Sequence, residues 1–342
     1  MIEVKNLVKR YGDHLAVDHL SFTVADGQIY GFLGPNGAGK STTMNIMTGY
    51  LGATEGDVIV DGHNILEEPE AARRAIGYLP EIPPVYPDMT VLEYLRFCAE
   101  LKKLPKAERD NQITQVVTLT HLEDMAGRLI RNLSKGYRQR VGLAQAILGF
   151  PKIIILDEPT VGLDPKQIIE IRDLIRQLAQ EHTVILSSHI LSEVREVCDH
   201  VMIIHKGKLV ACDTPENLEH HLSGAGSLDL VVKAAVEQAE AALAAVPAVT
   251  GHTAADNGDG TVSLNVTGEG DIREALFYAF ADAKCPILEL RPQLASLEDV
   301  FLELTETTDA VSGAEEAAPQ DGDAQTTEAE PAGEEDIHES DL

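Results

Sequence analysis

A glycine-rich stretch near the N-terminus has the residue types that hold a nucleotide phosphate. Residues 34–41 read GPNGAGKS, which fits the pattern G-x-x-x-x-G-K-[ST], between the apolar run QIYGFL and the helix-forming run STTMNIMTGY. Glycines let consecutive backbone N–H groups face one point, and the start of a helix adds partial positive charge. A chance match in a chain of this length is on the order of 1%. The stretch therefore predicts a phosphate-binding loop.

Each position of this loop has an expected task. Lys40 is expected to reach the β- and γ-phosphates, and the Ser41 hydroxyl to bind Mg²⁺. The predicted cofactors are therefore ATP and Mg²⁺. The other contacts to the nucleotide are expected from Gly34, Pro35, Asn36, Gly37, Ala38, Gly39 and Thr42.

Two carboxylates and a histidine follow later apolar runs. Asp157 and Glu158 come after the run IIIL, and His189 comes after VILSS. Asp157 can hold Mg²⁺ through water, and Glu158 can act as general base on an attacking water. Alone, an acidic pair before a proline is more often a solvated turn, and a lone histidine is more often structural. Because ligands bind at the carboxyl ends of parallel strands, we expect these side chains to meet the phosphate loop.

A second stretch also has the features of a phosphate site. Residues 132–147 read NLSKGYRQRVGLAQAI, with Ser134 and Gly136 in a turn before a helix-forming run. Such a turn offers backbone N–H groups and the positive end of a helix dipole. Because residues 34–41 already provide a stronger phosphate site, the use of the second one needs an explanation.

The elements that position these residues alternate between strands and helices over residues 1–222, which we predict to be one α/β domain. The runs QIYGFLG, KIIILD and TVILSSH are short, apolar and rich in β-branched residues, as buried strands of such a sheet are. The runs IEVKNLVKRYG and AVDHLSFTVADGQIY alternate instead. With a turn at Asp26–Gly27, they predict an antiparallel addition.

A small second domain is predicted over residues 223–305, after a linker at residues 223–227. Its runs follow the order β-α-β-β-α-β, with a hairpin turn at DNGDG and a last helix at SLEDVFLELT, which predicts a ferredoxin-like α+β fold. Residues 306–342 contain no Lys or Arg and many acidic residues. Such a segment cannot bury enough apolar surface to offset its ordering entropy, so we expect a disordered acidic tail.

The composition excludes several classes of protein. A chain of 342 residues that is 44% hydrophobic is long enough for two domains. A net charge of −29 and the absence of tryptophan argue against nucleic acid as the main partner. No apolar run reaches the length of a membrane span, and MIEVKNLVKRYG is not a signal peptide. We therefore expect a cytoplasmic protein with no direct membrane insertion.

The ordered set of phosphate loop, LSKGYRQR, LDEPTVGLDP and SSH resembles the ATP-binding subunits of ABC transporters, over roughly residues 2–221. The resemblance implies a P-loop NTPase fold with an antiparallel β subdomain and a helical subdomain. LSKGYRQR resembles the family's LSGGQ signature, with Lys135 and Tyr137 at the positions of a Gly and the Gln. In the family two domains dimerise head to tail, and this turn, with Ser134 and Gly136, caps the ATP of the other chain. A homodimer is the simpler reading, and pairing with a relative is the alternative.

The resemblance also implies roles for further residues. Asp164 in VGLDP corresponds to the loop that links the two sites of the dimer. Tyr11 is expected to stack on adenine with Val17 beside it, although an ordinary edge-strand tyrosine is the alternative. Glu81 stands where the family has Gln and is expected to offer an oxygen to Mg²⁺. As a carboxylate it should bind the metal more tightly.

The complete motif set predicts an ATPase subunit of an ABC transporter. ATP closes a dimer, hydrolysis opens it, and the motion drives a separate membrane permease that holds the subunit at the inner face of the membrane. In the family a groove of the helical subdomain, here near Val85, Tyr86 and Pro87, receives a coupling helix of the permease; a plain surface loop is the alternative. The C-terminal unit resembles the extension of export-type subunits, so export is expected.

Two other functions stay open from the sequence. One is a soluble ABC clamp that acts on translation or chromosomes, although such proteins usually carry two ATP domains or a long coiled coil. The other is a regulator that binds ATP without turnover, against which the intact Glu158 argues.

Overall fold

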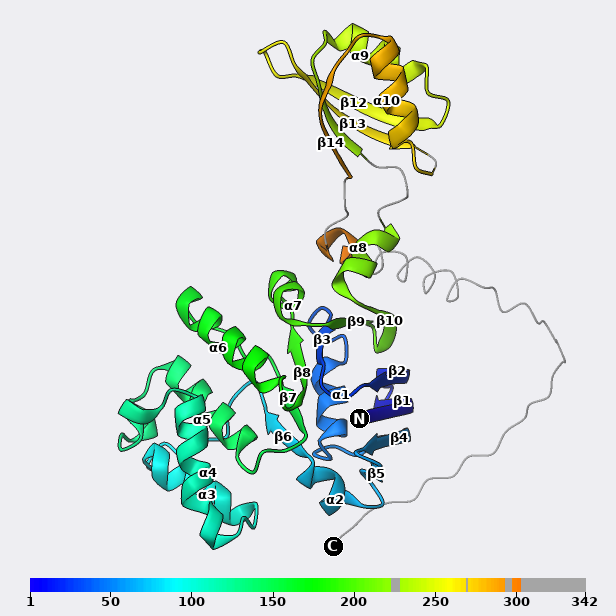
Figure 1. Ribbon diagram of the computed structural model, residues 1–342. Coiled ribbons are helices and arrows are strands. Elements are labelled where there is room, and N and C mark those ends of the chain that lie inside the picture. The colour runs from blue at the N-terminus through cyan, green and yellow to red at the C-terminus, as the bar shows by residue number, and fades with distance from the viewer. Residues whose placement is uncertain (223–227, 269, 293–296, 303–342) are drawn as a thin grey trace, which may run out of the picture.

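The computed structural model describes residues 1–222, 228–268, 270–292 and 297–302, and a six-stranded sheet lies at its centre (Figure 1). The strand order is β10-β9-β3-β8-β7-β6, with β10 antiparallel to β9 and the other neighbours parallel. All residues of β3, β7 and β8 are buried, as continuous apolar runs in a parallel sheet should be, so these predicted strands are confirmed. The bounds are β3 (Ile29–Leu33), β6 (Ile76–Leu79), β7 (Ile153–Leu156), β8 (Thr183–Ser188), β9 (His200–His205) and β10 (Lys208–Asp213).

A second, antiparallel sheet has the order β2-β1-β4-β5, which confirms the predicted antiparallel addition. The position predicted for its first turn is wrong. The hairpin of β1 and β2 turns at Gly12 and Asp13, where Gly12 has a φ of +57°. Asp26–Gly27 instead leads from β2 into the central sheet, so it joins two sheets and not two paired strands. The bounds are β1 (Ile2–Tyr11), β2 (His14–Val24), β4 (Glu55–Val60) and β5 (His63–Asn64).

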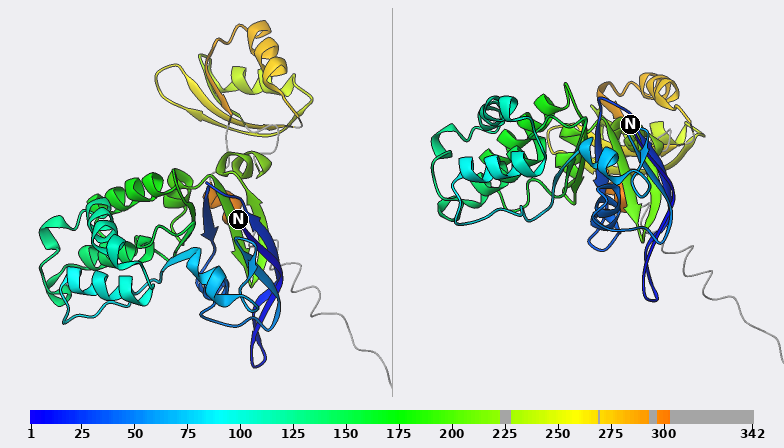
Figure 2. Two further views of the ribbon diagram at one scale, coloured as in Figure 1. Left: turned by 60° about the horizontal axis from the view of Figure 1, so that its bottom comes forward. Right: turned by 90° about the horizontal axis from the view of Figure 1, so that it is seen from below.

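Alternate residues of the central strands pack on two different sides. Phe32, Ile155 and Ile185 belong to a hydrophobic core shared with α1 and the antiparallel sheet. Leu33 and Ile154 belong to the core shared with the helices of the other side. Figure 2 accordingly shows the helical subdomain and the antiparallel sheet on opposite sides of the central sheet. This arrangement leaves the carboxyl ends of β3, β7 and β8 to form one edge.

The helices fall into a flanking set and a helical subdomain, which confirms the predicted class of fold. The subdomain begins with α3, whose capping box of Thr90 and Glu93 fixes its first residue. The flanking helices are α1 (Lys40–Met47), α2 (Pro69–Arg74), α6 (Pro165–Leu178), α7 (Leu191–Val197) and α8 (Pro215–Leu222). The subdomain contains α3 (Val91–Leu101), α4 (Lys106–Leu119), α5 (Lys135–Ile147) and the 3₁₀ turns Glu123–Met125 and Ile130–Asn132.

Gly77 in β6 allows α5 to approach the sheet closely. A Cβ at this position would collide with the carbonyl oxygen of Ala146 and lie 2.8 Å from the Pro151 ring. Gly77→Ala is therefore expected to lower the free energy of unfolding by about 2 kcal/mol, measured by denaturant titration. Gly52→Ala is the control, because a Cβ there meets nothing within 4 Å. Equal unfolding midpoints for the two variants would show that the close approach of α5 to β6 does not contribute to stability.

The small C-terminal unit is an antiparallel sheet of order β12-β13-β11-β14 with two helices. Its elements follow the order β-α-β-β-α-β, as the ferredoxin-like prediction requires. Leu276 and Phe280 of α10 pack in a hydrophobic cluster with the inward residues of β11 and β13. The bounds are β11 (Leu228–Val232), α9 (Val236–Ala244), β12 (Val249–Asp256), β13 (Val262–Gly268), α10 (Arg273–Asp282) and β14 (Ile287–Pro292).

The helical residues 297–302 pack away from the small sheet. Leu297 and Val300 are buried in the same core as Val194 of α7 and Leu218 of α8. The predicted second domain, residues 223–305, is therefore not one packing unit, because the chain returns to the larger body after β14. The predicted linker at 223–227 and tail at 306–342 lie outside the described residues. Among the residues that are described, no helix has the length and apolar composition needed to cross a membrane.

Candidate active site

The phosphate loop, residues 34–39, joins the carboxyl end of β3 to the first residue of α1. Gly37 and Gly39 have φ angles of +83° and +104°, which residues with a Cβ rarely adopt. A Cβ on Gly34 would collide with a carbonyl oxygen of β9, and one on Gly39 would lie 2.6 Å from a carbonyl oxygen of β2. Glycine at these positions therefore lets the loop lie directly on the neighbouring backbone, with the N–H groups of α1 at its end.

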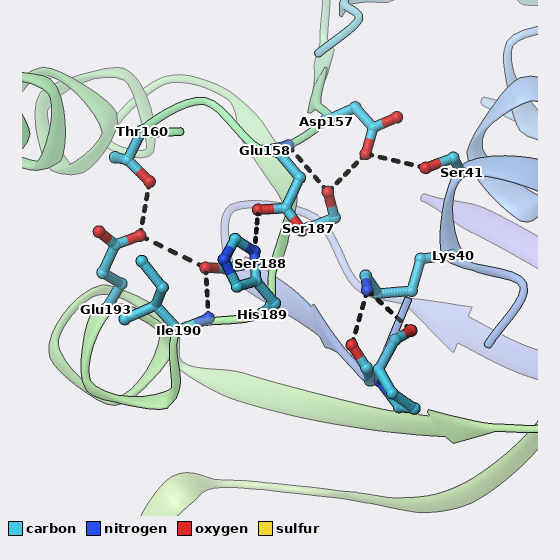
Figure 3. A network of polar contacts seen from close by, with 12 residues as sticks. Lys40, Ser41, Asp157, Glu158, Thr160, Ser187, Ser188, His189, Ile190 and Glu193 are labelled. Carbon is cyan, nitrogen blue, oxygen red and sulfur yellow. Dashed lines mark hydrogen bonds and ion pairs between the residues drawn. The ribbon is translucent and has the colours of Figure 1, made fainter. Parts of the chain in front are cut away.

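The Lys40 side chain folds back over this loop. Its Nζ donates hydrogen bonds to the carbonyl oxygens of Gly34, at 2.6 Å, and Pro35, at 3.3 Å (Figure 3). Lys40 is only 7% exposed. Burial lowers the pKa of Lys40, and the charges of Glu158 and Asp157 oppose that effect. The ammonium group is thus held where the phosphates of a nucleotide would lie.

Asp157 and Ser41 meet at the end of β7. The Ser41 hydroxyl donates to Asp157 Oδ1 at 3.3 Å, and Ser187 Oγ donates to the same oxygen at 2.6 Å (Figure 3). A hydroxyl and a carboxylate are oxygen donors of the kind that Mg²⁺ prefers, completed by water and phosphate oxygens. The donor set of this site therefore fits Mg²⁺.

Glu158 is held in an unusual backbone conformation. Its φ of +49° lies in the left-handed region, which costs a non-glycine residue about 1–3 kcal/mol and is retained at functional sites. Its N–H donates to Ser187 Oγ at 2.8 Å, and its Oε2 is hydrogen-bonded to His189 Nδ1 at 2.8 Å (Figure 3). The Glu158 carboxylate can accept a proton from a water molecule, and the His189 imidazole can hold the carboxylate in place.

One cleft of about 550 Å³ brings most of the predicted residues together. Residues 35–42, from the phosphate loop and the first turn of α1, line it, and the catalytic candidates Glu158 and His189 reach it from the ends of β7 and β8. Three residues that line it were not among the predicted site residues, namely His14, Ala16 and Val161. The full lining is Tyr11, His14, Ala16, residues 35–42, Glu81, Glu158, Val161 and His189.

The prediction for Val17 is wrong. Val17 is 0% exposed and packs in the core beneath the antiparallel sheet, whereas its neighbour Ala16 lines the cleft. Side chains alternate between the faces of a strand, so consecutive residues cannot both face the nucleotide. The pairing of Tyr11 with His14 across the β1–β2 turn places both residues at the rim of the cleft. That pairing is the signal by which His14 could have been found.

Tyr11 is 49% exposed and lines the cleft, and the Lys9 ammonium lies over its ring at 5.2 Å from the centroid. Because stacking of a base on an aromatic ring is worth about 1–3 kcal/mol, Tyr11→Ala is expected to weaken ATP binding roughly tenfold. Isothermal titration of the purified protein with ATP measures this. Tyr11→Phe keeps the ring and should bind ATP within a factor of about two of the unchanged protein. Unchanged affinity in Tyr11→Ala would exclude stacking on this ring.

The signature turn, which contains Ser134 and Gly136, packs against the start of α6. Ser134 caps α5 by accepting the Tyr137 N–H at 3.4 Å, and Asp164 caps α6 by accepting the Gln167 N–H at 3.0 Å. A Cβ on Gly136 would collide with the Gln167 side chain. Within the described part of the chain, none of Ser134, Gly136 and Asp164 lines the cleft of about 550 Å³. One chain therefore holds a phosphate loop and a signature turn that do not face each other.

Relatives identify the family by sequence. A family model described as "ABC transporter" matches residues 17–161. The chain is 42% identical over 212 residues to the bacitracin transport ATP-binding protein BcrA of Bacillus licheniformis, covering 61% of this chain and 68% of that protein. It is 31% identical over 312 residues to the linearmycin resistance ATP-binding protein LnrL of Bacillus subtilis, covering 90% of this chain and 99% of that one. The likeness to LnrL therefore includes the small C-terminal unit.

Solved structures of ABC transporter subunits resemble this chain as well. One described as the ATP-binding subunit of an ABC transporter has 31% identity and a TM-score of 0.60, and the match covers 65% of this chain and 92% of that chain. The cassette MJ0796, described as a dimer in a post-hydrolysis state bound to ADP and Pi, has 26% identity and a TM-score of 0.57, over 63% of this chain and 98% of that chain. Together with the cleft, these likenesses show that the chain belongs to the ABC transporter family and is one of its ATP-binding, ATP-hydrolysing subunits.

Proposed function

We propose that two copies of this chain close on two ATP molecules, and that this closing and reopening drives a separate membrane permease in the direction of export. The observation that carries the proposal is the separation of the signature turn from the phosphate loop of the same chain. Each chain then supplies half of each of two equivalent sites, as a head-to-tail dimer with two-fold symmetry requires. The dimeric state described for MJ0796 supports it.

The residues of the cleft have distinct roles in this proposal. Lys40 and the N–H groups of the phosphate loop bind the β- and γ-phosphates. Ser41 and Asp157 would hold a bound Mg²⁺, which would supply positive charge against the phosphates. Glu158 accepts the proton of the attacking water, and His189, which also lines the cleft, holds the Glu158 carboxylate and would contact the γ-phosphate of a bound ATP.

Glu81 connects the nucleotide cleft to a second groove. It lines both, and the second groove, of about 790 Å³, is lined also by Tyr50, Ile82 and Pro84. Tyr50 and Ile82 are 83% and 81% exposed, and large apolar side chains so exposed mark interaction surfaces. We propose this groove as the docking site of the permease, with Glu81 as an oxygen donor toward Mg²⁺ at its inner end.

The docking position expected from sequence, Val85 to Pro87, stays a prediction, since Tyr86 and Pro87 are exposed. Val85 packs against the core of the helical subdomain, and the Tyr86 ring packs edge-on against Phe97 at 5.4 Å between centroids. Val85 therefore supports the helical subdomain, whereas the Tyr86 side chain stays 51% exposed. The groove of about 790 Å³ is lined by residues a few positions earlier in the chain, Pro80 to Ile82 and Pro84.

The permease proposal is tested by co-purification. Tagged protein with Glu158→Gln, which should hold the ATP-bound state, is produced in its own cells, and the membranes are solubilised with detergent in the presence of ATP. A multi-span membrane protein is expected to co-purify, and much less of it with the added change Ile82→Asp, which replaces an exposed apolar side chain of the groove by a charged one. Recovery of ribosomal or chromosomal proteins instead would overturn the transport proposal.

A further inference from the structure

We propose that Glu193 is a positioning residue for ATP hydrolysis, which fastens together the two loops that carry Glu158 and His189. The Glu193 side chain extends from α7 and is 6% exposed. Its Oε2 accepts a hydrogen bond from Thr160 Oγ1 at 2.5 Å and another from Ser188 Oγ at 3.3 Å (Figure 3). We call these three residues the Glu193 clamp. The inference rests on the roles proposed above for Glu158 and His189.

The loop after β7 needs such a clamp because of the conformation of Glu158. A positive φ at a residue other than glycine persists only where the surrounding contacts fix it. Ser187 Oγ holds the N–H of Glu158, and the carbonyl of Glu158 accepts the Val161 N–H at 3.2 Å. Thr160, which lies between Glu158 and the turn that follows, is fixed by Glu193. The hydrogen bond from Thr160 to Glu193 therefore adds a third contact that holds the turn after Glu158 in its strained conformation.

The loop after β8 is fixed by the same carboxylate oxygen. Ser188 Oγ donates to Glu193 and accepts the Ile190 N–H at 3.0 Å, so both neighbours of His189 are tied to α7. His189 itself has a half-exposed side chain, and its orientation depends on the backbone that carries it. A carboxylate accepts hydrogen bonds and does not donate them, so it forces both hydroxyls to point toward it. This leaves an oxygen lone pair of Ser188 for the Ile190 N–H.

The charge of Glu193 is balanced inside the protein. Its Oε1 lies 3.9 Å from Arg172 Nη2 on α6, and Arg172 also forms an ion pair with Glu196. A buried carboxylate paired in this way does not need a bound cation. The ion pair also connects the clamp to α6, whose cap is Asp164. The two catalytic loops are thus attached to the helix that begins next to the signature turn.

Removal of one hydroxyl tests the clamp with little change of shape. Thr160→Val is expected to lower kcat about tenfold and to leave KM for ATP within twofold, because the groups that bind ATP are untouched. Glu193→Gln, which keeps one acceptor oxygen, should lower kcat by a smaller factor. Ser192→Ala, an exposed hydroxyl of the same helix, is the matched control and should leave both constants unchanged.

The decisive readout is the combination with Glu158→Gln. Residues that act through one group have non-additive effects, so Thr160→Val should change the residual single-turnover hydrolysis of Glu158→Gln by less than twofold. Wild-type kcat in both Thr160→Val and Glu193→Gln would overturn the proposal, as would a full tenfold loss in the Glu158→Gln background. High turnover in Glu158→Gln alone would instead remove the role proposed for Glu158, so the two failures are distinguishable.

Discussion

Replacement of Glu158 by glutamine is expected to lower ATP turnover by a factor of about 10² to 10⁴ and to leave ATP binding intact. The amide keeps the size of the side chain and a hydrogen bond to His189, but it cannot accept a proton from the attacking water. The phosphate-binding groups of residues 34–41 are unchanged. Phosphate release at saturating ATP measures turnover, and isothermal titration measures binding.

A glutamate elsewhere on the surface provides the control for this variant. Glu216→Gln, on the exposed side of α8, removes one negative charge and should leave turnover within twofold. If Glu158→Gln hydrolyses ATP at the rate of Glu216→Gln, Glu158 is not the general base. If Glu158→Gln fails to bind ATP, the two carboxylates at the end of β7 act in binding and not in proton transfer.

Replacement of Lys40 by alanine is expected to weaken ATP binding about 10- to 100-fold. A hydrogen bond from a charged donor contributes about 1.5–3 kcal/mol, and the loop holds the Lys40 ammonium in position before the nucleotide arrives. Isothermal titration, and the rise in melting temperature on addition of ATP, both report the loss.

Lys5→Ala is the control that separates the loss of the Lys40 contacts from the loss of one positive charge. Lys5 lies on β1 and forms an ion pair with Glu3, so Lys5→Ala should bind ATP as the unchanged protein does. Binding within threefold of normal in Lys40→Ala would contradict the placement of the phosphates over residues 34–41. A circular dichroism spectrum that matches the unchanged protein shows that the variant is folded.

Short-range patterns predicted the strands and most of the cleft. The phosphate loop depends on glycines at fixed spacing, and β3, β7 and β8 are continuous apolar runs, so both are encoded within a few residues. Glu158 and His189 were expected at the same edge because parallel strands end there. The structure places them at one cleft with residues 35–42. Their roles in hydrolysis remain proposals for the variants to test.

Features that depend on contacts between distant segments could not be predicted in this way. Val17 and Ala16 are both apolar, and only the register of β1 with β2, which contains irregularities, decides which one faces the cleft. Residues 297–302 leave the small unit because Leu297 and Val300 fit a core built more than 75 residues earlier. Glu193 belongs to no motif, and its importance follows from where α7 places it.

The proposed ATP-dependent dimer is tested most directly by the molar mass of Glu158→Gln from light scattering, with and without ATP and Mg²⁺. We expect a molar mass of 37.0 kDa without nucleotide and twice that mass with ATP. With Ser134→Asn added, the mass should stay at 37.0 kDa in ATP, because asparagine still caps α5 but crowds the turn that meets the partner's phosphate. A Glu158→Gln protein that binds ATP and stays monomeric, or that dimerises equally without ATP, would contradict the account.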